Sequence, residues 1–166
     1  MSCGVFRASG RAHKAPGVTV TVTTMGTQEH HRADHLPYIA AVRRGIEARG
    51  IHVANMTATT AGDGRREATL VLYPDDTAFA ERVPPEASAI WDEDNGWSLL
   101  MRHGPLANHV HKGLGVVPDP KDVAAWAVAL LAQPEATPGR DDHPFRDHSA
   151  VDPEFEAQLA RYAPGA

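Results

Sequence analysis

The chain has 166 residues, which suits one domain of ordinary size with additional tails. Its hydrophobic content of 42% and charged content of 22% are close to globular averages, so a packed core is expected. The net charge of −5 excludes the basic footprint that nucleic acid or an anionic membrane would require, and the single cysteine, Cys3, excludes an intrachain disulfide and a cysteine-based zinc site.

Residues 1–33 are expected to form a disordered arm ahead of the domain. The alternation of Val and Thr over residues 18–24 is typical of a strand, but no neighbouring hairpin partner follows it. No apolar segment follows the basic residues of this arm, and no apolar run elsewhere reaches membrane-spanning length. We therefore expect a cytoplasmic protein without a secretory signal.

The first predicted helix covers residues 34–49. Asp34 suits the N-cap position, and Gly50 supplies a stop. Between them, one apolar stripe recurs at helical spacing, formed by Tyr38, Ile39, Val42 and Ile46.

Strands are predicted over residues 51–59, 66–73 and 107–112, with a hairpin over 87–103. The first two strands are joined by Gly62-Asp63-Gly64, and a longer connection over residues 74–86 follows them.

The hairpin turns at Asn95-Gly96, the strongest short-range hairpin signal, and two loop lengths are possible. A two-residue loop pairs Asp94 with Trp97 and places Trp91 and Trp97 on opposite faces. A three-residue loop, Asp94 to Gly96, pairs Glu93 with Trp97 and makes the two tryptophans diagonal neighbours on one face. We favour the second loop because it buries the apolar set together. That set is Ala89, Trp91, Trp97, Leu99 and Met101.

The last long helix is predicted from Asp119, its N-cap, with Pro120 at the first helical position. Residues 134–152 are rich in Pro, Asp, His and Gly and are interpreted as a linker, followed by a short helix near 153–162. The apolar stripe of the long helix is formed by Val123, Trp126, Ala127 and Leu130.

This order of elements predicts an α+β fold. We expect a two-layer sandwich in which a mainly antiparallel sheet of about five strands carries an N-terminal and a C-terminal helix on one face. The single domain covers residues 34–133, and residues 134–166 form a linker with a short helix or tail. The residues expected to determine the structure are Trp91, Gly96, Trp97 and Trp126.

The chain contains ten histidines, so metal-binding sites are considered among the candidate sites. His109 and His111 lie two residues apart on one side of a predicted strand, and His103 on the adjacent strand is a candidate third ligand. The alternative is an exposed polar sheet face, which we favour. A second group, His30, His31, Asp34 and His35, lacks the H-E-x-x-H spacing and is interpreted as a solvated helix start.

No other pattern points to catalysis. The acidic triplet Asp92-Glu93-Asp94 is interpreted as solvated turn chemistry, because Asp and Asn stabilise turns through local hydrogen bonds. Asp147 and His148 lie in the predicted linker, where no rigid scaffold would hold a catalytic geometry. Ser88 and Ser98 have no evident base beside them. The chain lacks the motifs of dinucleotide binding, the P-loop, the nucleophile elbow and the kinases.

The middle of the chain resembles a small actinobacterial family that is catalogued as a domain of unknown function. The resemblance rests on the W-D-E-x-x-G-W hairpin at residues 91–97 and on the segment 114–120, which opens an Ala- and Trp-rich helix. It covers about residues 34–133 and implies an opening helix and two strands before the hairpin. The family brings no activity, cofactor or catalytic residue.

Two hypotheses about function follow. The first is a non-enzymatic interaction or regulatory module, without a cofactor, that binds a protein partner or a second copy of itself through a sheet face or edge. Its candidate surface consists of Ile90, Leu100 and Val110. The rival is a metal-binding protein or metal-dependent enzyme that uses His103, His109 and His111. Neither nucleic acid nor a membrane is an expected partner.

Overall fold

The computed structural model describes residues 32–74, 86–103, 106–133 and 144–165. The predicted arm up to residue 31 and most of the predicted connection over 74–86 lie outside the described residues. The elements in chain order are α1 (Leu36–Glu47), β1 (Ile51–Thr60), β2 (Arg66–Pro74), β3 (Glu86–Asp92), β4 (Gly96–His103), β5 (Leu106–His111), α3 (Pro120–Ala132) and α4 (Pro153–Ala160).

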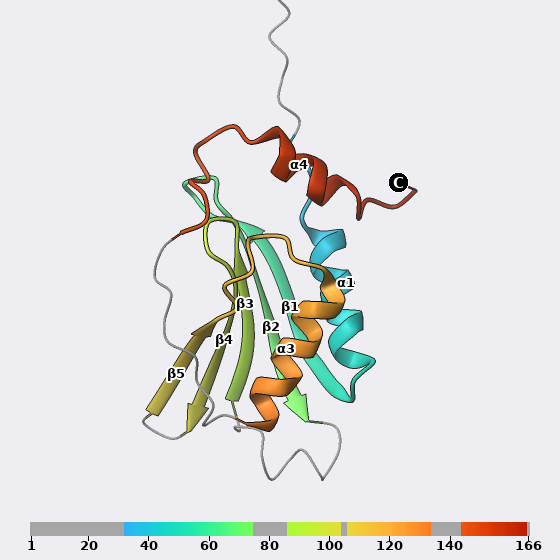
Figure 1. The fold of residues 1–166 in the computed structure, drawn as a ribbon, viewed down its shortest axis with the longest axis vertical. Helices are drawn as coiled ribbons and strands as arrows, with labels where there is room; N and C mark the ends of the chain where they lie inside the picture. The colour runs from blue at the N-terminus through green and yellow to red at the C-terminus, as the bar shows by residue number, and fades with distance from the viewer. Residues whose placement is uncertain (1–31, 75–85, 104–105, 134–143, 166) are drawn as a thin grey trace, which may run out of the picture.

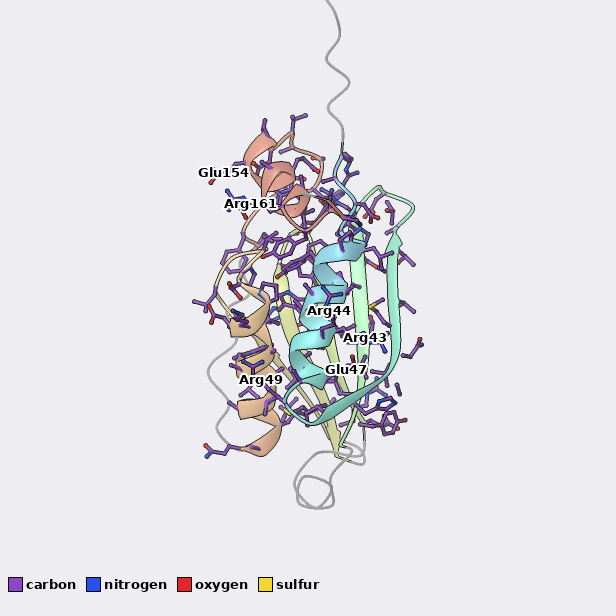
Figure 2. All side chains as sticks on the ribbon, turned by 90° about the vertical axis from the view of Figure 1, so that its right-hand side faces the viewer. Arg43, Arg44, Glu47, Arg49, Glu154 and Arg161 are labelled. Carbon is purple, nitrogen blue, oxygen red and sulfur yellow. The ribbon has the colours of Figure 1, made fainter. Side chains whose placement is uncertain are left out.

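The five strands form one antiparallel sheet in the order β1-β2-β3-β4-β5, so every strand pairs only with its neighbours in sequence. Helices α1 and α3 pack against each other on one face of this sheet (Figures 1 and 2). The predicted two-layer α+β sandwich is therefore confirmed. Helix α4 lies across one end of the sheet (Figure 1).

Helix α1 begins two residues later than predicted, at Leu36. The Asp34 carboxylate accepts a hydrogen bond from the Leu36 N–H at 2.9 Å, so it satisfies a free donor of the first turn from outside the helix. The helix ends at Glu47, and Gly50 follows with φ of +81°. The predicted apolar stripe is confirmed, because Tyr38, Ile39, Val42 and Ile46 are all buried.

The core lies between the helices and the inner face of the sheet. The alternation of the strands brings the predicted set of β3 and β4 residues to this face, and all five members are buried. They meet the stripe of α1 and, from α3, Val123, Ala127, Leu130 and Leu131. Trp126 is only partly buried at the edge of this core, where the Lys112 ammonium lies 5.7 Å from its ring centroid.

The hairpin register differs from the prediction by two positions. Trp91 pairs directly with Trp97 and Asp92 with Gly96, so the loop is Glu93 to Asn95 and the predicted pairing of Glu93 with Trp97 is wrong. The cause is Asp92, whose Oδ1 accepts hydrogen bonds from the N–H groups of Asp94 at 3.0 Å and Asn95 at 2.8 Å, so the turn starts one residue earlier. A shift of two positions preserves the faces, and both tryptophans remain on the inner face.

Both tryptophans have partners for their indole N–H groups. Trp91 donates to the Val116 carbonyl at 2.7 Å, and Trp97 donates to the Tyr38 hydroxyl at 2.8 Å. Tyr38 in turn donates to the Pro118 carbonyl at 3.0 Å, and burial raises the pKa of its phenol. These bonds fasten the loop between β5 and α3 onto the hairpin and α1.

We expect Gly96→Ala to lower the free energy of unfolding by about 2–5 kcal/mol. Gly96 has φ of +70°, and a Cβ there would lie 2.5 Å from the Gly115 carbonyl oxygen, so conformational strain and a backbone clash add. Denaturant midpoints measure the effect. Gly62→Ala is the matched control, because a Cβ added at Gly62 would meet no atom within 4 Å, and it should change stability by less than about 0.5 kcal/mol.

Candidate functional site

The acidic turn of the hairpin is not wholly solvated, because the Glu93 side chain is completely buried. The prediction of solvated turn chemistry is wrong for this residue. Its Oε1 accepts the Arg66 backbone N–H at 2.8 Å, and its Oε2 accepts Nε and Nη2 of the same arginine at 3.0 and 2.7 Å. A buried carboxylate needs such donors because burial without them is very costly.

Two further arginines reach Glu93. Nη2 of Arg32 donates to Oε1 at 2.6 Å, and Nη1 of Arg146 donates to Oε2 at 2.9 Å. Glu156 on α4 completes the group by accepting both terminal nitrogens of Arg66, at 3.0 and 2.7 Å. We call these residues the tip cluster: Arg32, Arg66, Glu93, Arg146 and Glu156.

The charges of the tip cluster compensate one another. Burial alone would raise the pKa of Glu93, but hydrogen bonds and charge from Arg66, with a further bond from Arg32, outweigh it and hold that pKa below its ordinary value. Glu156 behaves in the same way, with Arg66 and the Ala33 N–H as its donors. Both carboxylates are therefore ionised at neutral pH.

The tip cluster joins segments on both sides of the sheet strands in sequence to one end of the sheet. Arg32 precedes α1, and Arg146 and Glu156 follow α3, whereas Arg66 begins β2 and Glu93 lies in the loop between β3 and β4. Residues 144–152, the described part of the predicted linker, contact the hairpin: the Phe145 N–H donates to the Asp94 carbonyl at 2.7 Å, and His148 Nδ1 lies 2.8 Å from Asp94 Oδ2. The hairpin therefore holds His148 in place, and this contact was not predicted from the sequence.

Helix α4 adds aromatic contacts at the same end. Its N-cap, Asp152, accepts the Phe155 N–H at 3.0 Å. The Phe155 ring contacts two guanidinium groups, 4.8 Å from Cζ of Arg66 and 4.2 Å from Cζ of Arg146. Leu159 is fully buried, and the Tyr162 ring lies 5.1 Å from that of Tyr38.

A pocket of about 300 Å³ lies between α4 and the loop that precedes α3. Arg146 lines it, and its Nε is buried without a hydrogen-bond partner, 3.7 Å from Asp152 Oδ2. The Arg146 charge is already engaged by Glu93, and one water molecule between Arg146 Nε and the Asp152 carboxylate would satisfy this remaining donor.

The register of β4 and β5 does not bring the three sheet histidines to one place. The rings of His109 and His111 lie 4.8 Å apart on the outer face. His103 pairs with Leu106 while His109 pairs with Leu100, three positions away, or about 10 Å along the strand. The described part of the chain contains no group of three or more metal-ligating side chains, and the His103 side chain is not among the described ones.

His109 has a different role in the fold. Its Nε2 lies 2.8 Å from Ser98 Oγ, so a serine without an evident base in the sequence does have an imidazole beside it. Ser98 is only 4% exposed, which keeps its hydroxyl from a substrate. The contact satisfies a buried hydroxyl rather than activating a nucleophile.

The predicted interaction surface is divided between the two faces of the sheet. Ile90 and Leu100 lie half-buried on the outer face. Val110 pairs with Leu99, is 1% exposed and belongs to the core. Its inclusion in the surface is therefore wrong, because its pairing with the core residue Leu99 turns Val110 inward.

We expect Glu93→Gln to lower the free energy of unfolding by about 3–5 kcal/mol, because three arginines lose their shared counter-charge in a buried place. Chemical denaturation measures this loss. Glu86→Gln, at a side chain that is 71% exposed, is the control and should cost less than about 1 kcal/mol. Equal effects of the two substitutions would contradict the role of the tip cluster.

We expect the contribution of His148 to stability to fall as pH rises. The hydrogen bond to Asp94 raises its pKa, so the charged imidazole stabilises the fold fully below the ordinary value of 6.5, and this stabilisation is lost as pH rises through the raised pKa. The unfolding free energy of His148→Gln should therefore differ from wild type more at about pH 5.5 than at about pH 8.5. In an Asp94→Asn background this pH dependence should largely disappear.

Within the described residues, no helix is long and apolar enough to cross a membrane.

Comparison with known proteins places the chain in a family without an assigned activity. No curated protein and no solved structure matches the chain. The model of one family matches residues 38–129, more than half of the chain. An actinobacterial source and the hairpin motif as a family marker stay predictions. The chain belongs to the Family of unknown function (DUF6292).

Proposed function

We propose that this domain is a protein-interaction module that associates with a second copy of itself through the outer face of its sheet. The observation that carries the proposal is the uncharged centre of that face. Among the described residues, both long helices, α1 and α3, lie on the other face. The solvent side of α1 and the turn after it are strongly charged, with Arg43, Arg44 and Glu47 on the helix and Arg49 in the turn (Figure 2).

The register defines the centre of the outer face as two rows of paired residues. Neither row contains an aspartate, glutamate, lysine or arginine, whereas Arg102 and Glu86 lie beyond one end and Asp92 and Glu67 beyond the other. An apolar and hydroxyl-rich centre with a charged rim is the usual anatomy of an interface. The rows are His109, Leu100, Ser88, Val71 and Asn55, and His111, Ser98, Ile90, Thr69 and Thr57.

The size of the face favours a second copy as the occupant. Five strands about 4.8 Å apart, with about seven residues each at 3.4 Å, present a flat area of roughly 570 Å². Side-chain relief increases the accessible area toward the ~800 Å² that each partner buries in a standard interface. An uncharged centre does not repel an identical copy, as a face with one sign of charge would.

Sedimentation velocity over a concentration series tests the proposal. We expect wild type to dimerise at tens of micromolar and Leu100→Asp to weaken dimerisation at least tenfold, because the interface would bury an unpaired carboxylate. Leu114→Asp is the matched control, since Leu114 is 61% exposed in the loop that precedes α3, away from the outer face. A wild-type protein that stays monomeric, or an equal effect of both substitutions, would refute the proposal.

A further inference from the structure

Helix α4 binds the domain through a carboxylate that is held by several converging hydrogen-bond donors. The Glu156 carboxylate accepts both terminal nitrogens of Arg66, at 3.0 and 2.7 Å, and the Ala33 N–H at 2.6 Å. The Arg66 side chain is only 4% exposed and is held from behind by Glu93. A bidentate arginine with a converging backbone N–H is a built carboxylate site.

The apolar contacts of α4 follow one helical stripe. Phe155, Leu159 and Tyr162 are spaced i, i+4 and i+7, the pattern of a helix docked in a groove. Phe155 contacts the guanidinium groups of Arg66 and Arg146, Leu159 is fully buried, and Tyr162 meets Tyr38. Glu154 and Arg161 are exposed (Figure 2).

The site and its occupant belong to different parts of the chain. Tyr38, Arg66 and Glu93 lie inside the family-matched residues 38–129, whereas α4 lies beyond them. The eight residues of α4 are too few to form a stable helix alone, so its contacts with the domain hold it. Ten residues, 134–143, connect the two parts and can span at most about 36 Å.

We propose that this end of the domain is an exchangeable docking site for an acidic, aromatic helix, and that the α4 segment of a second copy occupies it in trans. Every copy carries the sequence that fits the site. Attachment within one chain gives an effective concentration in the millimolar range, so exchange becomes substantial when two copies are held together or when the chain itself reaches about a millimolar. Exchange at lower concentrations rests on the proposed self-association, whereas the docking site and exchange at high concentration do not.

A labelled peptide of residues 144–165 tests the docking site on full-length chains that carry Leu100→Asp, which removes association through the outer face. We expect a host with Glu156→Gln and Leu159→Ala to bind the peptide at least tenfold more tightly than a host with an unaltered α4, because its own helix no longer competes. A Glu156→Gln peptide should bind the altered host at least tenfold more weakly. A Glu154→Gln peptide is the matched control and should bind as the unaltered peptide does.

Three outcomes would overturn the docking site. The first is that the peptide does not bind the altered host. The second is that Glu156→Gln and Glu154→Gln in the peptide lower its affinity for that host equally. The third is that the affinity of the unaltered peptide does not change with salt concentration. If the altered host does not fold, a full chain cut at a protease site inserted between residues 134 and 143 replaces it. There the labelled peptide should exchange with the bound fragment, and a failure to exchange overturns the proposal.

Mixing two full-length chains tests the second copy as occupant. At chain concentrations of about a millimolar, which match the effective concentration of the attached helix, the altered host and a chain with an unaltered α4, both carrying Leu100→Asp, should form a heterodimer in sedimentation that excess peptide dissolves. Peptide binding without a heterodimer would overturn exchange between copies. Because the outer face is disabled in every arm, this result is independent of the proposed self-association.

Discussion

The structure depends on the burial of one carboxylate. Glu93 lies at the end of a hairpin and, in an ordinary turn, would be hydrated. Here it is fully buried, so its charge must be matched by donors that replace water. Arg66 supplies the nearest donors from β2, and Arg32 and Arg146 bring the two flanks of the domain to the same point. Glu93 fixes the orientation of the Arg66 guanidinium group, and in this orientation Arg66 binds Glu156 of α4.

The elements with local signals could be predicted from the sequence. The α1 stripe and the cap of α3 depend on residues within a few positions, and the structure confirms both. The faces of Trp91 and Trp97 were predictable for a similar reason, because a strand alternates with a period of two. The register itself was not, because both loops considered from the sequence began at Asp94 or Asn95, whereas hydrogen bonds to the Asp92 side chain start the observed loop at Glu93.

The tip cluster could not be predicted because its members are distant in sequence. Arg146 and Glu156 follow Glu93 by more than fifty residues, across a segment whose composition is typical of a linker. One local signal was present. Arg66 has the same parity on its strand as the buried Ala68, Leu70 and Leu72, and Glu93 has the same parity as Trp91. Opposite charges on the core-facing positions of two paired strands indicate a buried ion pair, since an unpaired charge there would be too costly.

The sheet and the tip cluster form at different times during synthesis of the chain. Every strand pairs with a neighbour in sequence, so the meander can assemble as soon as its hairpins leave the ribosome. Glu156 is translated 63 residues after Glu93, which corresponds to roughly 3–13 seconds at ordinary rates of elongation. During that interval Arg66 has only Glu93 as its carboxylate partner from the tip cluster. The nascent domain therefore displays an open carboxylate site until α4 follows and closes it.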